Sequence, residues 1–143
     1  MAALTQARTV PVLAVQNSVR NSIAAPASTR IWAGAFIGKT AAGTTGRALV
    51  AGDKFLGLCL ETVDNRDGGA GDLDIPYTTD MQIEHAVTGA ASAADVGKPV
   101  YASDDNTLTL TATNNSLMGV IERWVSSTTC IIRVFGQKEI VLS

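Results

Sequence analysis

Residues 107–113 read TLTLTAT, so Leu108 and Leu110 alternate with threonines. A period of two places successive side chains on opposite faces of a strand, which here makes one face apolar and the other polar. Residues 54–63, KFLGLCLETV, repeat the pattern, because every second residue from 56 to 60 is leucine. Both segments therefore predict half-buried β-strands.

The composition favours the same fold class along the whole chain. The 143 residues include 13 glycines and many Thr, Ser and Asn residues, which suit turns between short strands. Aromatic residues make up only 5% while hydrophobic residues reach 46%, so the core has to be built from aliphatic side chains. The length suits one domain. We predict an all-β protein, a small β-barrel or β-sandwich of roughly eight or nine short strands.

Turn residues divide the chain after residue 29 into short extended segments. The expected strands are 30–37, 47–50, 54–63, 72–78, 81–88, 107–113, 117–125, 128–135 and 139–142, and residues 100–103 are expected to form a further extended segment. One helical turn is expected over 90–97, where Ser92 fits the N-cap and Gly97 the left-handed end. Pro76 has no backbone N–H, which predicts that its strand lies at a sheet edge.

Residues 1–29 differ in composition and sequence pattern from the rest of the chain. They mix small and β-branched residues with Pro11 and Pro26, and neither a helical nor a strand period persists. We predict an extended N-terminal arm over 1–29, followed by a β-domain over 30–143. The alternative is an edge strand at 9–15 that pairs with a partner on docking.

Charge is distributed unevenly. Residues 1–30 contain three arginines and no acidic residue (+3), whereas the remaining chain has 8 basic and 13 acidic residues (−5), which gives the net charge of −2. Nucleic-acid binding needs a basic field, so we expect no direct nucleic-acid partner. The basic leader suits docking, although the arginines could instead only solubilise a loose terminus. The candidate interface residues are Arg8, Val10, Val12, Val15, Arg20, Arg30 and Trp32.

Motifs for catalysis and for metal or cofactor binding are weak. Gly38-Lys39-Thr40 lacks the first glycine of a phosphate-binding loop, and residues 68–74 (GGAGDLD) place leucine at the ligand position of the calcium nonapeptide. His85 is the only histidine and lies on the more apolar face of its predicted strand, with no nucleophile motif nearby. We predict a non-enzymatic protein with no catalytic residue, no metal and no cofactor, in which His85 belongs to the core or an interface.

Apolar segments give three further expectations. Gln6, Arg8 and Pro11 interrupt the first apolar run, so we expect no signal peptide, no transmembrane span and no membrane partner. Cys59 and Cys130 lie in apolar runs and are expected as reduced core thiols, with a disulfide between neighbouring strands left open. The two tryptophans, at positions 32 and 124, suit the core and an interface equally well.

One stretch resembles a known family. Residues 95–105 read DVGKPVYASDD and precede the Thr-rich strand. An L-x-G-x-I strand follows at Leu117, Gly119 and Ile121. Earlier in the chain, residues 51–57 (AGDKFLG) contain a G-D-x-x-x-G motif between two short strands. Together these segments are similar to the small decoration (cement) proteins of tailed-bacteriophage capsids. The resemblance covers roughly residues 30–136 and carries no catalytic signature.

The resemblance implies a compact β-domain that binds the major capsid protein lattice on the outer surface of the virion. It further implies a homotrimer at local three-fold positions, a terminal arm that reaches neighbouring subunits, and synthesis in the host cytoplasm. Three alternatives stay open: another virion component such as a head-fibre base or tail accessory protein, a carbohydrate-binding module, and a hydrolase with an unrecognised site.

Overall fold

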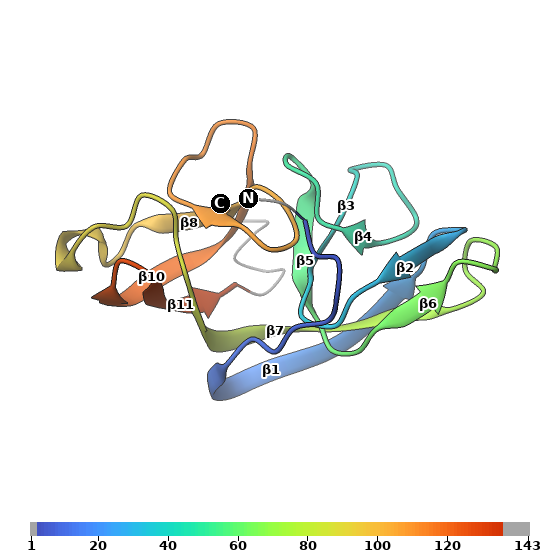
Figure 1. Cartoon of the computed structure of the whole chain (residues 1–143), viewed down its shortest axis with the longest axis horizontal. Coiled ribbons are helices and arrows are strands. Elements are labelled where there is room, and N and C mark those ends of the chain that lie inside the picture. The colour runs from blue at the N-terminus through green and yellow to red at the C-terminus, as the bar shows by residue number, and fades with distance from the viewer. Residues whose placement is uncertain (1–2, 136–143) are drawn as a thin grey trace.

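The computed structural model describes residues 3–135, with the side chains of residues 13–19 left out of the description. The described chain is all-β, as predicted, and its antiparallel sheets are not closed into a barrel (Figure 1). The strands are β1 (Val12–Ala24), β2 (Thr29–Ile31), β3 (Phe36–Lys39), β4 (Arg47–Ala48), β5 (Lys54–Cys59), β6 (Val63–Asn65), β7 (Asp74–His85), β8 (Pro99–Ala102), β9 (Leu108–Thr109), β10 (Ser116–Ser126) and β11 (Thr129–Val134).

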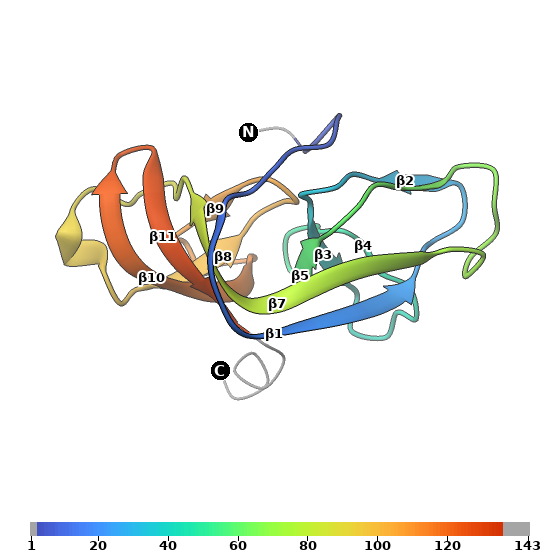
Figure 2. The same ribbon diagram turned by 90° about the horizontal axis from the view of Figure 1, so that it is seen from below.

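The long strand β7 joins the two halves of the main sheet (Figures 1 and 2). One edge of β7 pairs with β1, from Val12 opposite Ile83 to Ala24 opposite Asp74. The other edge pairs first with β5 and then with β11. Strands β3 and β4 continue the sheet beyond β5, whereas β10, β8 and β9 continue it beyond β11, and β2 and β6 form a separate two-stranded sheet.

Several strand boundaries differ from the sequence-based expectation. The segment 30–37 is divided between β2 and β3, because Gly34 turns the chain with a φ of +85°. The segments expected at 72–78 and 81–88 form one strand, in which Asp80 has a φ of +59° where a turn was expected. The segment 107–113, with the clearest alternation, forms ladder pairs with β8 only at Leu108 and Thr109.

Pro76 lies in the central strand β7, so the prediction that its strand is a sheet edge is wrong. The Pro76 carbonyl accepts a hydrogen bond from the Leu60 N–H, one residue beyond the last residue of β5. The N–H and C=O of one strand residue point to the same side, so the proline nitrogen faces the place where β5 has ended. The missing N–H therefore costs only the return bond to the Leu60 carbonyl, at the end of the β5–β7 pairing, and leaves the β1–β7 ladder intact.

The helical turn has the predicted caps. A short 3-10 helix, η1, spans Ala93–Asp95, and the Ser92 side chain accepts a hydrogen bond from the Ala94 N–H. The Asp95 carboxylate accepts from the Ala91 and Ser92 N–H groups, which completes a capping box. Gly97 follows with a φ of +91°. The last predicted strand, 139–142, lies outside the described residues.

Two apolar clusters form the core. The first lies between β3, β5, β7, β8, β10 and β11 and includes the fully buried Phe36, Met118 and Ile132. The second lies near β2 and β6 and includes Ile31, Ile37 and Ile75. Cys130 belongs to the first cluster and Cys59 to the second, and both are buried free thiols.

The segment expected as an extended arm is built into this fold. Residues 12–24 form β1, and residues 3–11, which we call the strap, cross between the two halves of the sheet, as the dark blue segment of Figure 2 shows. Val10 is buried in the first cluster, Leu4 packs against the second, and Ala25 is buried within it. The prediction of a separate arm missed these contacts because an edge strand with register shifts leaves no regular period in the sequence.

A buried carboxylate fixes the turn between β4 and β5. Asp53 accepts hydrogen bonds from Arg47 Nη2 at 2.6 Å and Nε at 2.9 Å and from the Val50 N–H at 3.0 Å, and its side chain is 4% exposed.

We expect Asp53→Ala to lower the free energy of unfolding by about 2 kcal/mol, because it leaves these donors without their acceptor. Urea unfolding measures the loss. The control is Asp64→Ala, which breaks an exposed pair with Arg66 and should leave the midpoint nearly unchanged. Equal effects would contradict the assignment.

Candidate interaction surface

The structure does not bring the seven predicted interface residues together. Arg8 and Val10 lie in the strap and turn toward the protein. Val12, at the start of β1, is 44% exposed, and Arg20 is exposed further along the same strand. Val15 pairs with Met81 through the backbone, and its side chain is outside the description.

Arg30 and Trp32 lie on and just after β2. The Arg30 guanidinium stacks on the Trp32 ring at 3.9 Å from its centroid, and both residues are half-buried. One face of this indole is therefore covered by a cation from its own chain. Trp124 is also half-buried, and it packs against the first core cluster from β10.

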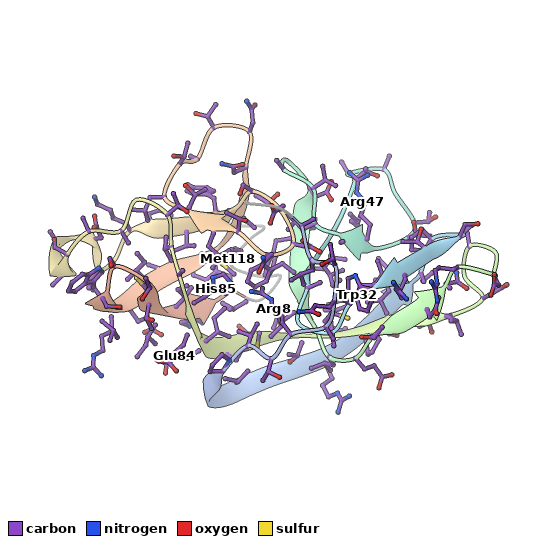
Figure 3. The ribbon with its side chains drawn as sticks, in the orientation of Figure 1. Arg8, Trp32, Arg47, Glu84, His85 and Met118 are labelled. Carbon is purple, nitrogen blue, oxygen red and sulfur yellow. The ribbon has the colours of Figure 1, made fainter. Side chains whose placement is uncertain are left out.

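Arg8 fastens the strap to three parts of the fold (Figure 3). Its N–H donates to the Ala33 carbonyl at 2.9 Å, and its Nε donates to the Gly34 carbonyl at 2.8 Å. Its Nη1 lies 2.7 Å from Nε2 of His85, at the end of β7, and its guanidinium lies 5.1 Å from the centroid of the Phe36 ring. A single side chain thus links the strap, the β2–β3 turn and the central strand.

His85 has the tautomer that this contact requires. Because a guanidinium has only donors, Nε2 of His85 accepts from Arg8, and Nδ1 carries the proton that it donates to the Ala86 carbonyl at 2.8 Å. Burial, followed by the Arg8 charge, lowers the pKa of His85 to about 4. The imidazole is therefore neutral at neutral pH. Sequence reasoning placed His85 on an apolar face but did not find its partner.

Acidic groups also lie near the strap. The Asp105 carboxylate accepts a hydrogen bond from the Leu4 N–H at 3.0 Å, and burial raises the pKa of this carboxyl group. Burial lowers the pKa of Arg8, whereas the charges of Asp105 and Asp104 act in the opposite direction. The strap is thus held by one half-buried cation, one buried carboxylate and two main-chain bonds, from the Arg8 N–H to the Ala33 carbonyl and from the Glu84 N–H to the Pro11 carbonyl.

A groove of about 260 Å³ lies between the strap and the end of β5. Val12 and Leu60, which is 37% exposed, are its open apolar residues. The Cys59 thiol donates to the Glu61 carbonyl, and burial raises its pKa to about 11, so the thiol stays protonated at neutral pH. The groove is lined by Arg8, Thr9, Val10, Val12, Ala33, Gly34, Leu58, Cys59 and Leu60.

The outer edge of β1 is open along the described chain. Within residues 3–135, β7 is the only strand that pairs with β1. Since the Pro76 carbonyl faces β5, the neighbouring Tyr77 faces β1 and pairs with Asn21. By the same alternation the N–H and C=O groups of Arg20 and Ser22 point away from β7. The Ala24 carbonyl, next in this series, accepts from the Gly46 N–H and closes the edge there.

A second hollow, of about 420 Å³, is lined by residues around the β3–β4 loop, among them Thr29, Thr45 and Arg47. Lys39, from the weak phosphate-loop motif, does not reach into a ligand site. Its ammonium group donates to the carbonyls of Thr40, Ala41 and Gly43 at 3.0 to 3.3 Å. Arg47 is already paired with Asp53. Lys39 and Arg47 are therefore both engaged within the protein.

Acidic residues of β6 and of the loop before β7 form contacts within that segment. Asp64 pairs with Arg66, which lowers the pKa of the Asp64 carboxyl group to about 2, and Asp72 accepts from the Gly69 N–H. Among residues 3–135 there is no group of three His, Cys, Asp or Glu side chains that could hold a metal ion. No helix in the same range is long and apolar enough to cross a membrane.

Comparison with known proteins identifies no relative. No protein-family model matches this chain, and no curated protein is significantly similar to it.

Proposed function

We propose that this protein is a structural virion component that binds the outer surface of a bacteriophage capsid and stabilises the expanded shell. The resemblance of residues 95–105 and 117–121 to capsid decoration proteins suggests this class. The open edge of β1 is the observation that supports it most directly, because an adhesive protein needs an exposed surface rather than a reactive cleft.

Strand addition is the binding mode that such an edge allows. The backbone groups of Arg20 and Ser22 can pair with an extended segment of the major capsid protein, and the main-chain bonds then supply affinity. Most proteins protect long edge strands with lysine, proline or a covering loop. Between Val12 and Ala24, β1 contains one charged residue, Arg20, and no proline.

Binding of this kind stabilises a shell by mass action. A ligand that binds only the assembled, expanded form lowers its free energy by RT ln(1 + [L]/Kd), about 4 kcal/mol at a thousandfold excess over Kd. A trimer would bind through three copies of the same edge, and this multivalency would raise its avidity for the lattice. The reaction requires no catalytic group and no cofactor.

The test is cosedimentation with expanded capsids that lack this protein. Ser22→Pro removes one outward N–H, at an edge position where proline is compatible with a strand. We expect the variant to fold and to bind capsids at least tenfold more weakly. Ser22→Ala is the matched control, since it removes the hydroxyl group and keeps the N–H, and it should bind normally.

Two results would count against the proposal. Equal binding by Ser22→Pro and the unchanged protein would exclude the β1 edge, and no binding of the unchanged protein to capsids would exclude the function. Association with tail or fibre components instead would support the other virion roles. Deletion of residues 1–29 is not a suitable test, because it would remove β1 together with the core residues Val10 and Ala25.

A further inference from the structure

We propose that the strap is an acid-releasable latch: it stays attached while His85 is neutral, and mild acid detaches it while the two halves of the sheet stay folded. This inference concerns residues 3–11 and their contacts and does not depend on the proposed capsid partner. The ligand that controls the latch is the proton.

The contact between Arg8 and His85 can exist in only one protonation state. Arg8 has no acceptor, and the 2.7 Å separation of its Nη1 from His85 Nε2 requires a lone pair on that nitrogen. Protonation places a hydrogen on Nε2, which removes the bond and sets two cations against each other. Both groups also lie against the Phe36 ring, which gives neither charge a counter-ion.

The other groups around His85 offer no compensation for a second positive charge. Nδ1 already donates to the Ala86 carbonyl, and the register partner on β11 is Cys130, a buried thiol whose pKa burial raises. Glu84 precedes His85 in β7, so its side chain leaves the opposite face of the strand, as Figure 3 shows. Asp104 and Asp105 act on Arg8 rather than on the imidazole.

The remaining attachments of the strap do not involve His85. They are the main-chain bonds from the Arg8 N–H to Ala33 and from the Glu84 N–H to Pro11, the Arg8 Nε bond to Gly34, the Leu4 N–H bond to Asp105, and the packing of Leu4 and Val10 against the core. Nη2 of Arg8 is buried and has no hydrogen-bond partner among the described residues. Attachment of the strap therefore includes an unfavourable free-energy contribution from this unsatisfied donor. Release would also uncover the groove wall formed by Leu58 and Cys59.

The direction of the pH effect follows from the lowered pKa of His85. In the attached state the group titrates at about 4, whereas a detached imidazole titrates near its ordinary value of about 6.5. The stabilisation of the attached state is therefore complete above about pH 6.5 and is lost as the pH falls toward 4. These two pKa values shift the equilibrium about 30-fold toward release between pH 8 and pH 5.

Hydrogen exchange of the full-length protein tests the latch. Protection factors of the Arg8 and Leu4 amides, each corrected for intrinsic exchange at its own pH, should fall about 30-fold between pH 8 and pH 5. The Ile132 amide in β11 should keep its protection. In His85→Gln the side-chain oxygen can accept from Arg8 at both pH values, so strap protection should not fall in acid. The raised pKa of Asp105 acts in the opposite direction to His85, because acid neutralises a carboxylate whose charge is disfavoured by burial.

An equal acid loss in His85→Gln, or full protection of the unchanged strap at pH 5, would overturn the proposal. If the strap of the His85→Gln variant is already detached at neutral pH, a second measurement tests the proposal. His85 is the only histidine, so its imidazole resonances can be titrated without ambiguity. We expect an NMR pKa below 5, which Arg8→Met moves upward; an ordinary pKa in the unchanged protein would contradict the latch.

Discussion

Phe36→Ala is expected to lower the free energy of unfolding by about 4 kcal/mol. Phe36 is 0% exposed and touches three partners: the Phe55 ring edge-on at 6.3 Å, the His85 ring at 5.4 Å and the Arg8 guanidinium at 5.1 Å. With aromatic residues at only 5% of the chain, few rings could fill the space left behind. Urea unfolding followed by tryptophan fluorescence measures the loss.

Phe135→Ala is the control for this substitution. Phe135 follows β11, is half-buried and lies 5.8 Å from the Arg133 guanidinium. Removal of this ring deletes less buried area, so we expect a loss of about 1 kcal/mol. Similar losses for the two variants would show that Phe36 is not central to the core.

Gly34→Ala is expected to detach the strap and to lower the free energy of unfolding by about 3 kcal/mol. A methyl group on Gly34 would overlap the Arg8 carbonyl and the Arg8 side chain, and the φ of +85° adds strain of about 1 kcal/mol for an L residue. Hydrogen exchange should show lost protection at the Arg8 amide even at neutral pH.

Gly71→Ala is the control that separates the backbone strain of a positive φ from the steric overlap with Arg8. Gly71 has nearly the same φ, +86°, but a methyl group there would meet nothing within 4 Å. This control should cost only the backbone strain, about 1 kcal/mol, and leave the strap attached. If the Arg8 amide lost protection in both variants, or in neither, the steric role assigned to Gly34 would be wrong.

Local periodicity was sufficient to predict the fold class. The alternation in 54–63 and the caps at Ser92 and Gly97 depend on neighbours in sequence, and the strand and both caps are present. The strand is not half-buried as predicted: it ends at Cys59, and both of its faces are buried from Phe55 onward. The partner change of β7 was not predictable, since it depends on a positive φ at Asp80 and on strands far apart in the chain. The position of Pro76 in a central strand was not predictable, because proline is tolerated there only where the neighbouring strand β5 ends.

The contacts of the strap were only half predictable. The phase of His85 with its apolar neighbours correctly predicted a place on the inner side, and it now packs against Phe36. Its pairing with Arg8, 77 residues away, left no local signal. The position of Arg8 between apolar residues of an acid-free segment was the sequence signal that could have suggested a cation packed against the core.

The shared strand β7 also sets an order of events during synthesis. The ribosome makes β1 first, yet Ala24 and Asp74 are the paired residues closest in sequence, so β1 has no partner until β7 emerges. The opposite edge of β7 is completed only when β11 follows. The nascent chain thus carries an unpaired, mainly uncharged strand for much of translation, which is when protection by a chaperone would matter most.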